Sequence, residues 1–354
     1  MGLRGRREFM LIQARLALLF LFCCSTAALA QPIPQASPAS DGKIHLDVVV
    51  AAKSGPPVSG LEQKDFTILD GKTPQPITSF RAFAGADAPV EVILFIDAVN
   101  TGYSNLAFER NQIDHFLRAN GGKLAHPTAL AIFTDAGVRM QNSFSTDGNA
   151  IADSLDQQTV ALRTITRSQG FYGAVDRFDL SMRALDQLAK VEAPHPGRKM
   201  VLWISPGWPM LSGPGVQLDS KQEKQLFQAI VSASTELRLA RLTLYNINPL
   251  GSAENTLNLF YYQQFLKGVS KPSQVSGGNL SLQVLAVQSG GMVLNSNNDV
   301  SALLQQAFAE ADAWYELSFE PAKAERPDEY HPIEVRVDKA GLMARTRTGY
   351  YAQP

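Results

Sequence analysis

The sequence predicts an α/β fold with a doubly wound, mostly parallel sheet that carries β segments on both flanks. Within residues 87–312, apolar runs of strand length alternate with amphipathic stretches of helical period. That alternation is typical of parallel strands joined by helices that cover both faces of the sheet. Residues 43–86 and 313–352 contain strand-like segments without helices between them, and these segments predict the flanks.

The first thirty residues are typical of a secretory signal peptide. Arg4, Arg6 and Arg7 give a basic start, residues 16–24 are apolar, and residues 28–30 (Ala-Leu-Ala) form a small-x-small cleavage signature. The apolar run is shorter than the roughly 20 residues that a spanning helix needs, so no membrane span is expected after cleavage. The sequence leaves both the general and the twin-arginine export route open. We therefore expect a periplasmic or secreted protein.

The composition of the remaining chain excludes several functional classes. Cys23 and Cys24 both lie in the predicted signal, so the mature chain would have neither a disulfide framework nor thiolate chemistry. A net charge of −1 gives no electrostatic argument for binding nucleic acid. Residues 31–42 are rich in Pro, Ser and Ala, which predicts a solvated linker.

The N-terminal β segment, residues 43–86, is expected to contain three short strands. Residues 44–50 are apolar and alternating, residues 66–69 form a second strand, and residues 77–83 a third. The dipeptide Asp70-Gly71 after the second strand is a hairpin turn signal.

The α/β region, residues 87–312, is expected to contain five strands buried on both faces. They are residues 90–96, 128–134, 200–204, 242–247 and 292–294. Helices with one apolar face are expected between and after these strands. Their apolar positions run over residues 106–117, 175–188, 226–237, 282–287 and 300–308.

The C-terminal β segment, residues 313–352, is again rich in strands. Residues 314–319, 333–337 and 342–351 alternate as half-buried strands do. We expect the two β segments to pair with each other. They would then form one small β-domain that carries the α/β domain as an insertion.

Several short motifs, taken in their order and spacing, resemble those of a known family. They are Asp65-Phe66-Thr67, Asp70-Gly71-Lys72, Asp97 with Asn100-Thr101, Ser289-Gly290-Gly291, Asn298-Asp299 and Thr348-Gly349-Tyr350-Tyr351. In these motifs the chain resembles the von Willebrand factor A-related proteins that are abundant in acidobacterial genomes. The resemblance covers nearly all of residues 43–352. It implies a von Willebrand factor A-like domain over residues 87–312 in an exported protein, and few such proteins have an assigned biochemical role.

The resemblance also implies a Mg²⁺ site at the carboxyl ends of the strands, where a D-x-S-x-S motif and two later loops supply oxygen ligands. The candidate ligands carried over to this chain are Asp97, Thr101, Ser168 and Ser205. Val99 and Pro206 depart from the pattern, because neither side chain offers a ligand atom. We therefore expect a degenerate metal-ion-dependent adhesion site and no required cofactor. The alternative is that Asp97 and Thr101 cap a turn and a helix.

The sequence contains no motif that predicts catalysis. It has no G-x-S-x-G elbow, H-E-x-x-H, P-loop or C-x-x-C, and its five histidines are never at metal-ligand spacing. We expect that the protein is not an enzyme. A hydrolase with an unrecognised site remains the alternative from another class.

Two insertions in the α/β region are candidates for contacts with a partner. Residues 205–219 carry Trp208 and Met210, and residues 248–279 carry Tyr261 and Tyr262. Aromatic and Met side chains on loops are favoured interface anchors, although they can instead cover the domain's own core. The predicted function is an exported, non-catalytic protein that binds a protein or envelope polymer through the carboxyl-end loops. A metal-dependent adhesion domain is the alternative within the binding class.

Overall fold

The computed structural model describes residues 42–53, 55–85, 88–158, 170–210, 218–251 and 260–354. All of them belong to one unit, Ser40–Pro354. The predicted signal peptide, nearly all of the predicted linker and the candidate ligand Ser168 lie outside the described residues.

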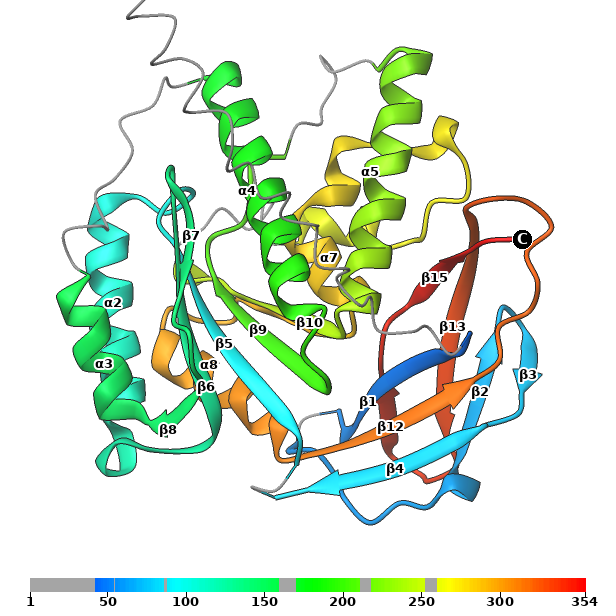
Figure 1. Cartoon of the computed structure of the whole chain (residues 1–354), viewed down its shortest axis with the longest axis horizontal. Coiled ribbons are helices and arrows are strands. Elements are labelled where there is room, and N and C mark those ends of the chain that lie inside the picture. The colour runs from blue at the N-terminus through cyan, green and yellow to red at the C-terminus, as the bar shows by residue number, and fades with distance from the viewer. Residues whose placement is uncertain (1–41, 54, 86–87, 159–169, 211–217, 252–259) are drawn as a thin grey trace, which may run out of the picture. The chain divides into compact units, whose positions relative to one another are not determined.

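The central sheet has the strand order β11-β10-β9-β5-β6-β7 (Figure 1). The chain runs from β5 outward to β6 on one side, and then through β9, β10 and β11 on the other side. This reversal between β5 and β9 defines a doubly wound sheet, so the predicted fold class is confirmed. The parallel strands are β5 (Val90–Asp97), β6 (Lys123–Thr134), β9 (Arg198–Ile204), β10 (Leu242–Ile247) and β11 (Val293–Leu294), and β7 (Gly137–Met140) is antiparallel to β6.

Helices cover both faces of this sheet. Alternate side chains of β5 enter two separate cores, with Leu94 and Ile96 in one and Ile93 and Phe95 in the other. One core is covered by α2 (Tyr103–Arg118), α3 (Gly148–Gln157) and α8 (Val300–Phe308). The other is covered by α4 (Phe171–Glu192), α5 (Ser220–Leu239) and α7 (Leu282–Gln288). Burial on both faces explains why the predicted strands are continuously apolar.

The two β segments form one sandwich, as predicted. Its sheets have the orders β14-β1-β12-β4 and β15-β13-β2-β3, so each sheet mixes strands from both ends of the chain. Their inward side chains share one core. The strands are β1 (Ile44–Ala52), β2 (Phe66–Asp70), β3 (Thr73–Gln75), β4 (Ser79–Ala84), β12 (Ala313–Phe319), β13 (Glu329–Val337), β14 (Leu342–Arg345) and β15 (Gly349–Ala352).

Two local expectations about the sandwich have opposite outcomes. The hairpin signal is confirmed, because Asp70 pairs with Thr73 across a two-residue turn in which Gly71 has a φ of 65°. The single strand expected over residues 342–351 is wrong. Those residues form β14 and β15, which belong to different sheets, because the chain crosses the sandwich between them.

A buried polar network joins the sandwich to the α/β domain. The Glu310 carboxylate, which follows α8, accepts a hydrogen bond from the Tyr245 hydroxyl of β10 at 2.7 Å and pairs with Arg345 of β14. Arg198 of β9 donates to the same Tyr245 oxygen at 3.0 Å and to the Glu310 carbonyl at 3.1 Å. Glu310 therefore balances the charge of Arg345, while the Arg198 guanidinium lies over the Trp314 ring, 5.4 Å from its centroid.

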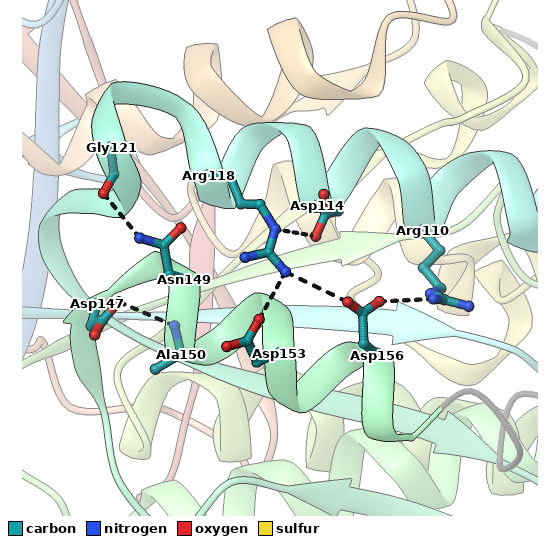
Figure 2. Close-up of polar contacts among 9 residues, drawn as sticks. All are labelled: Arg110, Asp114, Arg118, Gly121, Asp147, Asn149, Ala150, Asp153 and Asp156. Atoms are coloured by element: carbon teal, nitrogen blue, oxygen red, sulfur yellow. Dashed lines mark hydrogen bonds and ion pairs between the residues drawn. The ribbon is translucent and has the colours of Figure 1, made fainter.

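A second polar network fixes α3 on α2 at the surface (Figure 2). The Arg118 guanidinium donates to Asp114 at 2.8 Å and to Asp153 at 2.9 Å, and lies 3.5 Å from Asp156. Arg110 donates to Asp156 at 2.8 Å. Asp153 and Asp156 are both exposed, so they lie on the solvated face of α3.

Replacing Arg118 is expected to lower stability only slightly. The Arg118→Ala variant loses ion pairs that are exposed to water and screened by salt, so a small decrease in melting temperature should shrink further at high ionic strength. Calorimetry at low and high salt measures this effect. Arg139→Ala on β7, where the arginine is also exposed, is the control. A large decrease that persists at high salt would mean that the network is a main determinant of helix docking.

Candidate functional site

The carboxyl end of the parallel sheet brings three of the four candidate ligands together. Asp97 is the last residue of β5, Thr101 precedes α2, and Ser205 follows β9. Because β5 and β9 are neighbours, with Ile96 paired to Ile204, Asp97 and Ser205 leave the sheet side by side. This is the crevice at the switch point where open α/β sheets bind ligands.

The Asp97 carboxylate is fully buried and already saturated with donors from the protein. Its Oδ1 accepts the backbone N–H groups of Val99 at 3.0 Å and Asn100 at 2.9 Å. Its Oδ2 accepts the Asn100 side-chain amide at 2.8 Å and the Trp203 indole N–H at 3.1 Å. A carboxylate has about four acceptor positions. Asp97 therefore has the turn-capping role that the sequence left open.

Glu109 of α2 is the most unusual ionisable group near this site. It is fully buried, and neither of its carboxyl oxygens has a hydrogen-bond partner among the described residues. Burial, followed by the negative charge of Asp97, raises the pKa of Glu109 to about 9, and the nearby Thr101 hydroxyl opposes that shift. Burial also raises the pKa of Asp97, but hydrogen bonds from Asn100 and Trp203 act in the other direction. Glu109 is consequently the carboxyl group that holds a proton at neutral pH.

The sequence interpretation missed Glu109, although a signal was present. Leu106, Glu109 and Ile113 follow a spacing of three and four residues, which places all three on one face of a helix. Leu106 and Ile113 are buried in the core on that face. A glutamate among such positions predicts a buried carboxyl group.

The residues present do not fit a Mg²⁺ ion held by Asp97. Mg²⁺ demands oxygen ligands in octahedral geometry, with free lone pairs directed at the ion. The Asp97 oxygens are occupied, Glu109 is protonated, and the Ser205 hydroxyl already accepts the Gly207 N–H at 3.1 Å. Within the described ranges, no three His, Cys, Asp or Glu side chains are arranged to hold a metal.

Millimolar Mg²⁺ is therefore expected to leave the melting temperature unchanged. A ligand specific for the native state would add about 2.7 kcal/mol at a hundredfold excess over its dissociation constant. Thermal unfolding with MgCl₂ or EDTA measures the difference, and the Asp97→Asn variant is the control. A clear increase with Mg²⁺ that Asp97→Asn abolishes would contradict the expectation.

The candidate partner-binding residues are less exposed than the sequence suggested. Trp208 is only 4% exposed and packs edge-on against Trp203 at a centroid distance of 5.2 Å. The expectation that Trp208 is an exposed anchor is wrong, because its ring completes the core under α4, α5 and α7. Met210 is half-buried, as are Tyr261 and Tyr262 in a short 3₁₀ helix, Tyr261–Phe265.

Other aromatic side chains at this end of the sheet are open to solvent. Phe171 and Tyr172 are 58% and 81% exposed in the first turn of α4, and their rings meet edge to face at 6.1 Å. Phe260 is 52% exposed before the 3₁₀ helix, and Phe108 of α2 is 41% exposed. Figure 1 shows that α4 and α5 extend past the sheet at this end. The sequence analysis did not identify Phe171 and Tyr172 as candidates for partner contacts. The available signal was a pair of adjacent aromatic residues just before the first apolar position of a predicted helix.

Among the described residues, no helix combines the length and the hydropathy that crossing a membrane requires.

The comparisons with known proteins show remote similarity in structure only. No family model matches the sequence, and no curated protein resembles it. The open conformation of the pilus adhesin SpaC from Lactobacillus rhamnosus GG is 11% identical with a TM-score of 0.37, covering 86% of this chain and 49% of the adhesin. The TFIIH p34 N-terminal domain is 12% identical with a TM-score of 0.31, covering 63% of this chain and 98% of that domain.

A VWA domain is also among the similar structures. The SpRpn10 VWA domain is 12% identical with a TM-score of 0.29, covering 66% of this chain and 98% of that domain. The chain spans about half the length of the adhesin. With similarities this low, the α/β class rests on the strand order of the sheet itself, and membership of the von Willebrand factor A-related family stays a prediction from the sequence motifs.

Proposed function

We propose that the chain is an exported, non-catalytic binding protein that contacts its partner, a protein or an envelope polymer, through the carboxyl-end surface of the sheet. The observation that carries this proposal is the exposure of Phe171 and Tyr172 in the first turn of α4. Exposed aromatic pairs are favoured anchors at interfaces, because they offer large apolar area at low entropic cost. Phe108 and Phe260 add exposed apolar area at the same end.

A non-catalytic role is supported by the polar groups at this end. Asp97 is held by hydrogen bonds from the protein, and the Ser205 hydroxyl accepts the Gly207 N–H. A hydroxyl nucleophile needs an adjacent base within hydrogen-bond reach. The carboxylate beside Ser205 is that of Asp97, and its oxygens already accept four hydrogen bonds from other groups, so it is not free to act as that base.

The binding proposal is tested by pull-down from a cell-envelope fraction with matched variants. A partner retained by the wild-type protein is expected to be lost with the double variant Phe171→Ser, Tyr172→Ser. The control is the double variant Val191→Ser, Leu239→Ser. It removes exposed apolar side chains at the C-terminal ends of α4 and α5, away from the proposed surface. Equal retention of the partner by both double variants would contradict the assigned surface.

The exported form is expected to begin at Gln31. The cleavage signature Ala28-Leu29-Ala30 places the scissile bond after Ala30. Intact-mass spectrometry of protein recovered from the envelope or the medium measures the N-terminus. A recovered protein that retains Met1 would contradict the predicted cleavage.

A further inference from the structure

A pocket of about 340 Å³ lies between the edge strand β7 and the C-terminal half of α4, which is beside β7 in Figure 1. It is at the opposite end of α4 from Phe171 and Tyr172, so it is separate from the proposed partner surface. An engineered apolar cavity of about 150 Å³ in another protein is already large enough to bind benzene. The pocket therefore has room for an aromatic ring with a short chain.

The walls of this pocket are mostly apolar. They are formed by Val138, Met140 and Phe144 on one side and by Leu188 and Val191 of α4 on the other. Leu188 is buried, whereas Val191 is exposed, and Met140 and Phe144 are only partly covered by the core of this face. A thioether and a phenyl ring both make favourable contacts with an aromatic ring. These walls therefore fit an aromatic body.

A fully buried carboxylate, that of Glu192, lines the same pocket. Its Oε2 lies 3.2 Å from Nδ1 of His195, which is also a lining residue. Its Oε1 has no hydrogen-bond partner among the described residues. A buried carboxylate oxygen without a donor is unfavourable, because it has left water and gained nothing in return. A ligand in the pocket that brings an N–H donor would satisfy this oxygen.

The ammonium group of Lys199 does not pair with this carboxylate. Its Nζ donates instead to the backbone carbonyl of Glu192, at 3.1 Å, and to that of His195. Within the described ranges, His195 is the only basic side chain in ion-pair contact with Glu192. Lys199 therefore acts on the Glu192 charge from a distance and leaves Oε1 open to another donor.

A second carboxylate keeps this region negative. Glu91 of β5 acts on Lys199 together with Glu192, and its Oε2 is also buried without a hydrogen-bond partner in the described part of the chain. Arg241 adds no spare positive charge, because it already pairs with two other carboxylates. When His195 is neutral, two carboxylates thus share the charge of one ammonium group. A positively charged ligand would restore the balance.

We propose that this pocket binds a small aromatic amine, with its ring between Met140, Phe144 and Leu188 and its ammonium group at Glu192. The ammonium group donates to the open Oε1, which makes a charge-assisted hydrogen bond in a site that is largely withdrawn from water. A neutral aromatic molecule of the same shape contacts the walls but leaves the carboxylate charge uncompensated. An aromatic carboxylate is repelled by it. The proposal goes beyond the proposed function, since it concerns a small ligand at a different surface.

The proposal is tested by isothermal titration calorimetry of the mature protein at pH 8 with three probes of similar shape: 2-phenylethylamine, 2-phenylethanol and phenylacetate. The amine is expected to bind roughly tenfold to a hundredfold more tightly than the alcohol, and phenylacetate is not expected to bind. Glu192→Gln keeps the shape of the side chain and removes its charge, so it should lower the affinity for the amine to that for the alcohol. Asp179→Asn, which changes an exposed acid on the same helix, is the matched control and should keep the wild-type affinities.

NMR of the wild-type protein with 2-phenylethylamine gives a second measurement that does not depend on how the variants fold. Intermolecular nuclear Overhauser effects from the probe's ring to the Met140 methyl group and the Phe144 ring support the proposal. Three results would each overturn it: no binding of the amine, equal affinities for the amine and the alcohol, or contacts of the bound amine at another surface only.

Discussion

Deleting residues 314–354 is expected to abolish soluble, cooperative folding of the chain. The deletion removes β13, β14 and β15 and nearly all of β12, so β1 and β4 lose every strand partner and β2 keeps only the three-residue β3. Two or three isolated strands are marginal in water, and their unpaired edges promote aggregation. Soluble yield, size-exclusion chromatography and urea unfolding measure the outcome.

The control for this deletion is removal of Gln353 and Pro354 alone, which are exposed and outside the last strand. A graded test is Leu317→Ala in β12, whose side chain is fully buried in the sandwich core. That substitution is expected to lower the free energy of unfolding by about 2–5 kcal/mol. Met343→Ala, on an exposed apolar side chain, should have little effect. A truncated chain that stays monomeric with an unchanged unfolding transition would show that the sandwich contributes nothing to the stability of the α/β domain.

The parts of the fold that the sequence predicts well are those set by local pattern. Residues 92–96 of β5 are all apolar because both faces of the sheet are covered. The apolar run in the sequence is therefore enough to identify this strand. The end of α2 can also be predicted, because Asn and Gly are the residue types that commonly end a helix in the left-handed conformation. Asn120 and Gly121 follow the helix and have φ angles of 53° and 71°. These signals depend on a few neighbouring residues and do not need the rest of the molecule.

The missed helix α3 depends instead on a tertiary contact. Its first residue, Gly148, packs so closely on α2 that a Cβ there would lie 2.1 Å from the carbonyl oxygen of Leu117. Asp147 caps the helix by accepting the Ala150 N–H at 3.1 Å. An aspartate before a glycine is also a common turn signal, so the sequence alone does not distinguish a turn at Asp147-Gly148 from the start of a helix.

The candidate site was predictable in position but not in chemistry. Asp97 follows a buried strand, which places it at the carboxyl end of the sheet. Its four hydrogen-bond donors come from a turn and from Trp203 on the neighbouring strand, which no linear pattern records. Trp208 was misjudged for the same reason, because the ring that buries it is Trp203.

The stability of the wild-type protein is expected to fall as pH rises from about 5 to 9, in part because of Glu109. Its folded pKa of about 9 lies above the unfolded value of about 4.3, since burial and Asp97 disfavour the charged form. The stabilising contribution of the neutral carboxyl is complete below about pH 4.3 and is lost as pH rises through the folded pKa.

The Glu109→Gln variant separates this contribution from the other groups that titrate in the same range. Unfolding by urea at several pH values should show a flatter decline for Glu109→Gln, by up to about 1.4 kcal/mol per pH unit, because the amide cannot ionise. At pH 8 the variant should be at least as stable as the wild-type protein. Glu320→Gln, on an exposed glutamate after β12, is the control and should keep the wild-type slope. Identical pH profiles for the wild-type protein and Glu109→Gln would show that Glu109 is ionised in the folded state, and that a cation or a water molecule compensates its charge.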